Sequence, residues 1–189
     1  MTTEYKFDPT THTHYIGGRP VEGVTTVLRD LIPGYSASEW YLQRGTAVHA
    51  CAAMIGEGIE FEHDPQIDNQ VQAIRDFFRE VQPVVESVEL PVSSPAYRYA
   101  GIADLVATVG GVRMVIDYKA SFSAATPWQL AAYAMLMIPD VKVGMAVQIG
   151  ADGKYRCSEH YELKRFKNEW LALLTAYRVR RACRVKEGK

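Results

Sequence analysis

Cysteines are few in this sequence, and long apolar runs are missing from it. The three cysteines are scattered and odd in number, which argues against a disulfide framework and against a four-cysteine zinc or iron–sulfur site. The longest unbroken apolar run, Leu130 to Ile138, is too short to span a bilayer. The first twenty residues lack the basic start and apolar stretch of a signal peptide. We therefore expect an intracellular, cytoplasmic protein with no membrane association and no iron–sulfur cluster.

Net charge is also small, at −1, so the chain as a whole gives no nucleic-acid signal. Its distribution is uneven, because residues 164–189 carry nine Lys/Arg against two acids and the remainder of the chain carries −8. A basic C-terminal segment could follow a phosphate backbone. A solvated helix face that ends in a cationic tail would explain the same residues equally well.

The length and the patterning of the chain predict one domain over residues 1–189. An apolar fraction of 48% with 23% charged residues is ordinary for a globular protein. Helical patterns cover about 24–32, 38–57 (an interruption at Gly45 is left open), 64–82, 126–138 and 164–183. Extended or β-type runs cover 1–23, 84–92, 99–109, 112–119, 141–149 and 154–161. This order predicts an α/β (α+β) protein with a mixed β-sheet flanked by helices.

Two of the β-type runs are joined by Gly110-Gly111, a pair typical of a two-residue hairpin loop. With such a loop, Asp104 lies opposite Asp117, and the side chains of cross-strand partners share one face. Period-two alternation places Lys119 on the same face. A bulge would shift this pairing by one residue. The sequence thus predicts two carboxylates and one ammonium close together on an apolar strand surface.

Two acids that face each other need compensation, because like charges opposite one another destabilise a hairpin and burial raises the cost. A divalent cation that bridges Asp104 and Asp117 would supply it. The alternative is a plain ion pair between Lys119 and one of the acids, which leaves the other acid unexplained.

An Asp followed after a short turn by Asp-x-Lys resembles the PD-(D/E)XK nuclease superfamily. Three other motifs resemble its RecB-like exonuclease branch, which includes phage exonucleases and the mitochondrial genome-maintenance exonuclease. They are a G-x-x-x-H helix, a G-x-x-D strand and a Q-x-x-x-Y helix, here Gly45 to His49, Gly101 to Asp104, and Gln129 to Tyr133. The four motifs occur in the right order, and the resemblance implies a restriction-endonuclease-like fold.

The resemblance implies a Mg²⁺ or Mn²⁺ ion held by His49, Asp104, Asp117 and the carbonyl of Tyr118. It also implies that Lys119 orients or deprotonates the attacking water and stabilises charge on the phosphate. Oxygen-rich ligation suits Mg²⁺, and an imidazole ligand makes Mn²⁺ a substitute.

Gln129 and Tyr133 lie one turn apart on one predicted helix face, where they could hold a phosphate or the metal shell. An alternative is open for Gln129, because Thr126-x-x-Gln129 is also a capping box that would tie its side chain to the helix start. Further candidate substrate-binding residues are Arg44, Thr46 and Ser121.

The sequence departs from its relatives after the histidine. Several relatives place a Glu one turn further on, but position 53 is Ala. The nearest acids are Glu57 and Glu60, and Glu89 on the preceding strand is the candidate that could contribute instead.

The leading hypothesis is a metal-dependent DNA exonuclease, phage or prophage in type, that acts on single- or double-stranded ends in DNA recombination and repair. A recombination or single-strand-binding protein would be its partner. The alternatives are a flap or site-specific endonuclease of the same superfamily and a non-catalytic DNA-binding module with a nuclease-like fold.

Overall fold

A computed structural model describes residues 4–32 and 39–186 of the protein, without the side chains of residues 39–44 and 186. The helices are α1 (Val24–Leu31), α2 (Glu39–Gly56), η1 (Pro65–Ile67, a 3-10 turn), α3 (Asp68–Val81), α4 (Thr126–Ala134) and α5 (Leu163–Lys186). The strands are β1 (Tyr5–Asp8), β2 (Thr13–Ile16), β3 (Arg19–Gly23), β4 (Val84–Ser94), β5 (Tyr99–Val109), β6 (Val112–Lys119), β7 (Val143–Ile149), β8 (Tyr155–Cys157) and β9 (Tyr161–Glu162). None of the described helices is long and apolar enough to cross a membrane.

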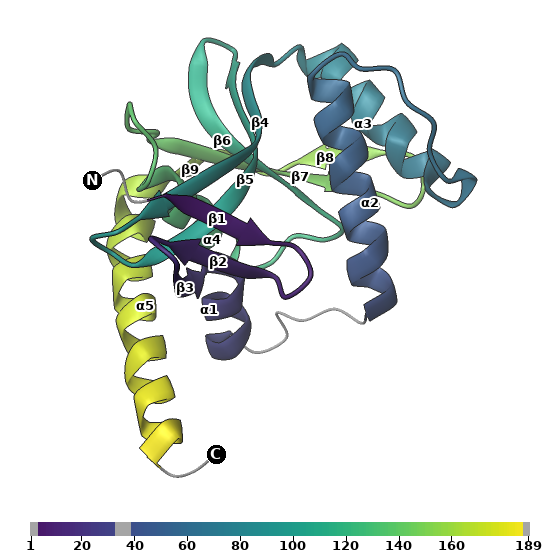
Figure 1. Ribbon diagram of the computed structural model, residues 1–189. Coiled ribbons are helices and arrows are strands. Elements are labelled where there is room, and N and C mark those ends of the chain that lie inside the picture. The colour runs from purple at the N-terminus through teal and green to yellow at the C-terminus, as the bar shows by residue number, and fades with distance from the viewer. Residues whose placement is uncertain (1–3, 33–38, 187–189) are drawn as a thin grey trace.

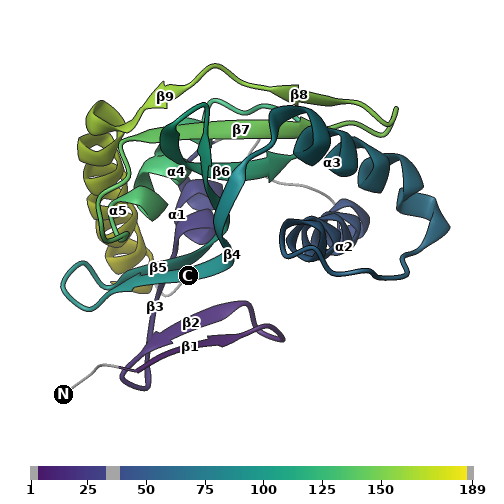
Figure 2. The ribbon, with the colours of Figure 1, turned by 90° about the horizontal axis from the view of Figure 1, so that it is seen from above.

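The strands form one mixed sheet in the order β1-β2-β3-β5-β6-β7-β8, with β4 paired to β5 and β9 paired to β7. The β3–β5 and β6–β7 pairs are parallel, and the other pairs are antiparallel. Helices α1, α4 and α5 lie on one side of the central strands, and α2 and α3 lie on the other (Figures 1 and 2). The predicted fold class, a mixed sheet flanked by helices, is confirmed.

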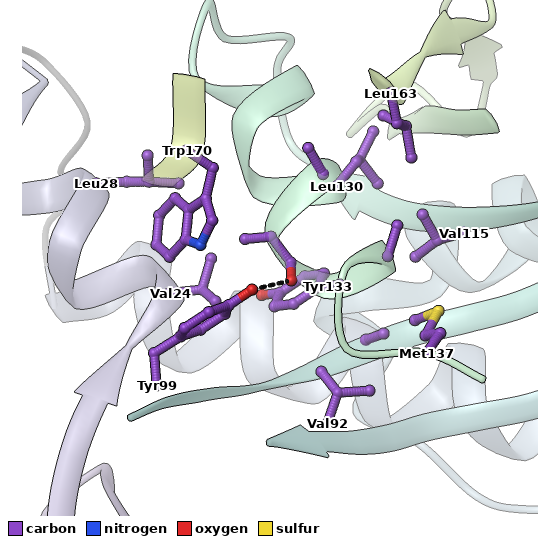
Figure 3. Close-up of a cluster of buried hydrophobic side chains, with 14 of the residues drawn as sticks. Val24, Leu28, Val92, Tyr99, Val115, Leu130, Tyr133, Met137, Leu163 and Trp170 are labelled. Atoms are coloured by element: carbon purple, nitrogen blue, oxygen red, sulfur yellow. Dashed lines mark hydrogen bonds between the residues drawn. The ribbon is translucent and has the colours of Figure 1, made fainter. Parts of the chain in front are cut away.

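The core on the α1, α4 and α5 side is built around an aromatic pair (Figure 3). The rings of Tyr99 and Trp170 meet edge to face, with their centroids 5.2 Å apart. The Tyr99 hydroxyl donates a hydrogen bond of 2.8 Å to the carbonyl of Ala132 in α4. Strand β5 and helices α4 and α5 are therefore joined by both apolar contact and a buried hydrogen bond.

The core on the other side packs α2 and α3 against the middle strands. Its largest fully buried ring is Phe77 of α3, and Leu105 and Ile116 face it from β5 and β6. As predicted, Asp64 begins this helical segment, where its carboxylate accepts a hydrogen bond of 2.9 Å from the backbone N–H of Gln66. Helix α2 continues through Gly45 without an interruption.

The structure corrects three predicted boundaries. Residues 5–16 form the β1–β2 hairpin, where only an extended segment was expected. Helix α4 ends at Ala134 instead of Ile138, and Pro139 disfavours helical backbone at the residue before it. The last predicted strand, 154–161, is divided into β8 and β9.

Strand β5 is shared between two partners on one side. β3 pairs with its first residues, Tyr99 and Ala100. β6 pairs with it only from Leu105 onward, and then continues beside β7 as far as Lys119. Residues 101–104 of β5 therefore lie in a fork of the sheet between β3 and β6.

The buried His14 of β2 makes the stability of the fold sensitive to acid. Its Nδ1 lies 2.9 Å from the Tyr5 hydroxyl. Burial, assisted by the charge of His12, lowers the pKa of His14 from 6.5 to about 4. Between these two pH values the unfolded chain takes up a proton that the folded chain refuses, so the free energy of unfolding falls as the pH is lowered.

We expect the stability difference between wild type and His14→Phe to shift in favour of the variant by on the order of 2 kcal/mol between pH 7 and pH 4. Urea unfolding at pH 7, 6, 5 and 4 measures it. A difference that stays constant with pH would show that His14 takes up its proton equally in both states.

Candidate metal and catalytic centre

Asp104 lies at the fork, immediately beyond the last paired residues of β5 and β6. The predicted register is confirmed from Val109 opposite Val112 to Leu105 opposite Ile116. At the next position the strands separate, and Asp104 Oδ2 accepts a hydrogen bond of 2.8 Å from the backbone N–H of Tyr118. A carboxylate thus takes the place of a strand partner, and this fixes the Asp104 side chain between the two strands.

On the other side of β5, the β4 strand brings a second acid to the same place. Val88 pairs with Leu105 and Leu90 pairs with Ala103, so the register places Glu89 opposite Asp104. Glu89 has a φ of 44°. This left-handed backbone costs a residue other than glycine on the order of 1–3 kcal/mol and is most often found at functional sites.

Helix α2 adds an imidazole to these two acids. His49 Nδ1 lies 3.3 Å from Asp104 Oδ1. One ligand atom each from His49, Glu89 and Asp104 lies within 4.8 Å of the others. Burial disfavours the charged imidazole, but the charge and hydrogen bond of Asp104 outweigh it and raise the pKa of His49 to about 9. A proton on His49 therefore balances Asp104, and a bound cation would displace that proton.

Asp117 and Lys119 form a closed polar network with Gln129 of α4. Lys119 Nζ lies 2.7 Å from Asp117 Oδ2 and donates a hydrogen bond of 2.8 Å to Gln129 Oε1. Gln129 Nε2 donates to Asp117 Oδ1 at 2.8 Å and to the Tyr133 hydroxyl at 3.1 Å. The amide thus holds the acid and the ammonium in one fixed arrangement.

This network settles the alternative role of Gln129. Helix α4 begins without a side-chain cap, and the Gln129 side chain is directed to Asp117, Lys119 and Tyr133. The capping box is therefore not formed. A contact of Gln129 or Tyr133 with a phosphate stays a prediction.

Gly101 explains how the G-x-x-D strand and the Q-x-x-x-Y helix fit together. A Cβ atom at Gly101 would lie 2.5 Å from Cε1 of Tyr133, closer than any side chain could tolerate. The absence of a side chain at Gly101 lets the Tyr133 ring lie directly against β5. The Tyr133 hydroxyl in turn accepts a hydrogen bond from Gln129. The strand motif and the helix motif therefore meet where Tyr133 packs against Gly101.

The pKa values of the three acids of the centre are shifted in different directions. Burial raises the pKa of Asp117 to about 6, against the attraction of Lys119 and with the added repulsion of Asp104. Burial and the charge of Asp104 raise the pKa of Glu89 to about 7. Burial also disfavours the charged form of Asp104, but His49 outweighs it and lowers the pKa of that acid. With all three acids ionised, and counting only the side chains that the structure describes, His49 and Lys119 leave one negative charge in excess.

The remaining predicted substrate residues are Arg44, Thr46 and Ser121. Thr46 is exposed on α2, and Ser121 is exposed in the segment between β6 and α4. The side chain of Arg44 lies outside the described part of the chain.

The basic C-terminal segment makes several contacts with the body of the protein. Arg178 of α5 is 2.9 Å from a carboxylate oxygen of Glu22. Arg184 and Arg180 lie 2.6 Å and 3.6 Å from the carboxylate oxygens of Asp30. These arginines therefore form ion pairs that connect α5 to β3 and α1.

Two features of the centre were not predicted in full from the sequence. Glu89 could have been placed opposite Asp104 by counting back from the turn that joins β4 to β5, where Ser94 pairs with Tyr99. The Tyr118 side chain carried no signal, because only its carbonyl was expected to contribute. In the structure its ring lies edge-on to His49, with centroids 6.2 Å apart.

Comparisons with known proteins add little to this picture. No family of known proteins matches the sequence, and no curated protein does. The crystal structure of an alkaline exonuclease, LHK-Exo from Laribacter hongkongensis, is similar at 15% identity and a TM-score of 0.41, over 86% of this chain and 93% of that chain. The structure of LHK-Exo in complex with dAMP is similar at 13% identity and a TM-score of 0.44, over 89% of this chain and 93% of that chain. Similarity at this level does not define an activity.

The contact between Gly101 and Tyr133 gives a prediction on stability. We expect Gly101→Ala to lower the free energy of unfolding by about 1–3 kcal/mol, because its new methyl group must displace the Tyr133 ring. Gly45→Ala is the matched control, since a Cβ there meets no described atom within 4 Å. Alanine in the middle of α2 should raise the free energy of unfolding by about 0.5–1 kcal/mol. Equal effects of the two substitutions in urea unfolding would contradict the proposed contact.

Glu89 gives a second prediction, with opposite effects on stability and metal binding. At pH 8 in EDTA, we expect Glu89→Gln to raise the free energy of unfolding by roughly 0.5–1 kcal/mol, since it removes a partly solvent-screened repulsion from Asp104. Its Mn²⁺ affinity should fall at least about 10-fold in calorimetry, because a ligand is lost.

Glu86→Gln on the same strand is the control for Glu89→Gln. Glu86 pairs with Arg113 at 2.7 Å, so its loss should leave Mn²⁺ affinity unchanged and should not stabilise the fold. Equal Mn²⁺ affinities of Glu89→Gln and wild type would exclude Glu89 as a ligand.

Proposed function

We propose that this protein is a divalent-metal-dependent nuclease that hydrolyses phosphodiester bonds in DNA and acts as an exonuclease. The observation that carries the proposal is the cluster of His49, Glu89 and Asp104, with ligand atoms within 4.8 Å of one another, beside the ion pair of Asp117 and Lys119. The donor set fits a divalent cation, because it offers carboxylate oxygens and one imidazole and holds an excess of negative charge. Such a set suits Mg²⁺ and also Mn²⁺.

His49, Glu89 and Asp104 would hold the cation directly. Asp117 and the carbonyl of Tyr118 are further ligands that the sequence resemblance implies. Electrostatic coupling supports Asp117 as a ligand. The charge of Asp117 contributes to the raised pKa of Glu89, and the charge of Asp104 contributes to the raised pKa of Asp117. The four ionisable groups therefore act on one another within a single site.

A divalent cation, when bound, lowers the pKa of coordinated water and neutralises charge that develops on the phosphate. The protein's own part is to place the ammonium of Lys119 beside the acids. Its contacts with Asp117 Oδ2 and Gln129 Oε1 restrict where Nζ can lie. From there it can donate to the attacking water or to a phosphate oxygen, and so orient the first and stabilise negative charge on the second.

The assignment to DNA and to exonuclease activity rests on the motifs of the sequence. The same resemblance supports a role in DNA recombination and repair, of phage or prophage type, together with a recombination or single-strand-binding protein. A cytoplasmic location is proposed separately, from the scattered cysteines and the pattern of the first twenty residues. A flap or site-specific endonuclease would use the same centre. A non-catalytic DNA-binding module is disfavoured by the intact network of Asp117, Lys119 and Gln129.

The proposal is tested on end-labelled single- and double-stranded DNA with Mg²⁺, Mn²⁺ or EDTA. We expect cutting only with metal, and we expect Asp117→Ala and Lys119→Ala to reduce its rate about 100-fold or more, because transition-state stabilisation is lost. Lys154→Ala, in the exposed turn before β8, is the control and should cut like wild type.

Cutting in EDTA, or cutting that survives both substitutions, would overturn the assignment of the centre. Binding without cutting on every substrate would favour the DNA-binding module. A requirement for a free end, tested by comparing linear with circular DNA, separates exonuclease from endonuclease activity.

A further inference from the structure

The Tyr118 side chain of β6 is buried beside the cluster of His49, Glu89 and Asp104, and its hydroxyl has no hydrogen-bond partner among the described residues. Only 3% of the residue is exposed. A buried polar group without a partner destabilises a fold, and such groups are few in proteins. Apolar packing alone would be served equally well by phenylalanine at this position.

Tyr118 is attached to the centre through both its backbone and its ring. Its backbone N–H donates to Asp104 Oδ2 at 2.8 Å. Its ring stands edge to face with His49, at a centroid distance of 6.2 Å and an interplanar angle of 77°. Phe77 meets the same ring at 6.2 Å and 87°. The phenol is therefore held in place between the core of α3 and the imidazole of the cluster.

The charges around the phenol keep its proton in place. Burial raises the pKa of Tyr118 well above its ordinary value, and the negative charges of Asp104 and Glu89 raise it further. A phenol hydroxyl can donate and accept a hydrogen bond, and here it does neither with any described residue. It is also under the influence of the two acids that belong to the cluster.

We propose that Tyr118 is a positioning residue of the metal centre, whose hydroxyl forms a hydrogen bond with a water molecule in the hydration shell of the cation held by His49, Glu89 and Asp104. This inference rests on the metal site of the proposed function. It assigns a partner to a buried hydroxyl that has none among the described residues. Groups that orient the shell of a metal in this way typically change metal affinity 10- to 100-fold when they are removed.

The test compares Tyr118→Phe with Tyr99→Phe and wild type. Each substitution removes one buried hydroxyl and keeps the ring. Tyr99 is the matched control, because its hydroxyl already has a protein partner in Ala132. Mn²⁺ affinity is measured from the loss of the free-ion signal in electron paramagnetic resonance. Thermal unfolding is followed in EDTA and at saturating Mn²⁺.

We expect Tyr118→Phe to bind Mn²⁺ about 10- to 100-fold more weakly than wild type, while its melting temperature in EDTA is unchanged or higher. Tyr99→Phe should show the reverse pattern, with wild-type Mn²⁺ affinity and a lower melting temperature in both conditions. Mn²⁺ should therefore raise the melting temperature of wild type and Tyr99→Phe more than that of Tyr118→Phe.

Wild-type Mn²⁺ affinity in Tyr118→Phe would overturn this inference and leave the proposed metal site intact. A lower melting temperature of Tyr118→Phe in EDTA would overturn it as well, because the hydroxyl would then already have a structural partner without the metal. Wild-type protein that binds no Mn²⁺ would overturn the metal site itself. The three failures are thus distinguishable from one another.

Discussion

Repulsion between three carboxylates is the constraint on which the rest of this structure depends. Glu89, Asp104 and Asp117 meet where the sheet divides, and the burial of Asp104 and Asp117 makes their charges costly. The protein offsets them with a proton on His49, the ammonium of Lys119 and a backbone N–H from Tyr118. Among the described side chains these groups leave one negative charge in excess, which a bound divalent cation would neutralise.

The two helical layers divide the work of holding this centre. On one side, α2 carries His49 toward Asp104. On the other, α4 carries Gln129, which fixes the pair of Asp117 and Lys119. The sheet between them is opened at residues 101–104, where β6 leaves β5. The centre lies where the pairing of β5 with β6 ends. Among its described residues, Glu89 has a left-handed backbone.

Much of this arrangement could be predicted, because it follows from local rules. A two-residue glycine turn fixes the hairpin register, and the register brings Asp104 and Asp117 to the same level of the two strands. The role of Gln129 could not be decided, since the same residues also spell a capping box and only the tertiary fold chooses between them. The position of Glu89 depends on the longer turn between β4 and β5, whose register the sequence does not fix. The surroundings of the Tyr118 hydroxyl depend on packing between elements that are distant in the sequence. The β1–β2 hairpin was missed because its short strands carry little periodic signal.

Cation binding at the centre is tested most directly by an anomalous difference map at the manganese edge, from crystals of the wild-type protein grown with Mn²⁺ at pH 8. We expect a peak at the fork of the sheet, coordinated by His49, Glu89 and Asp104. A map in which Mn²⁺ occupies other sites, with none at the fork, would contradict it.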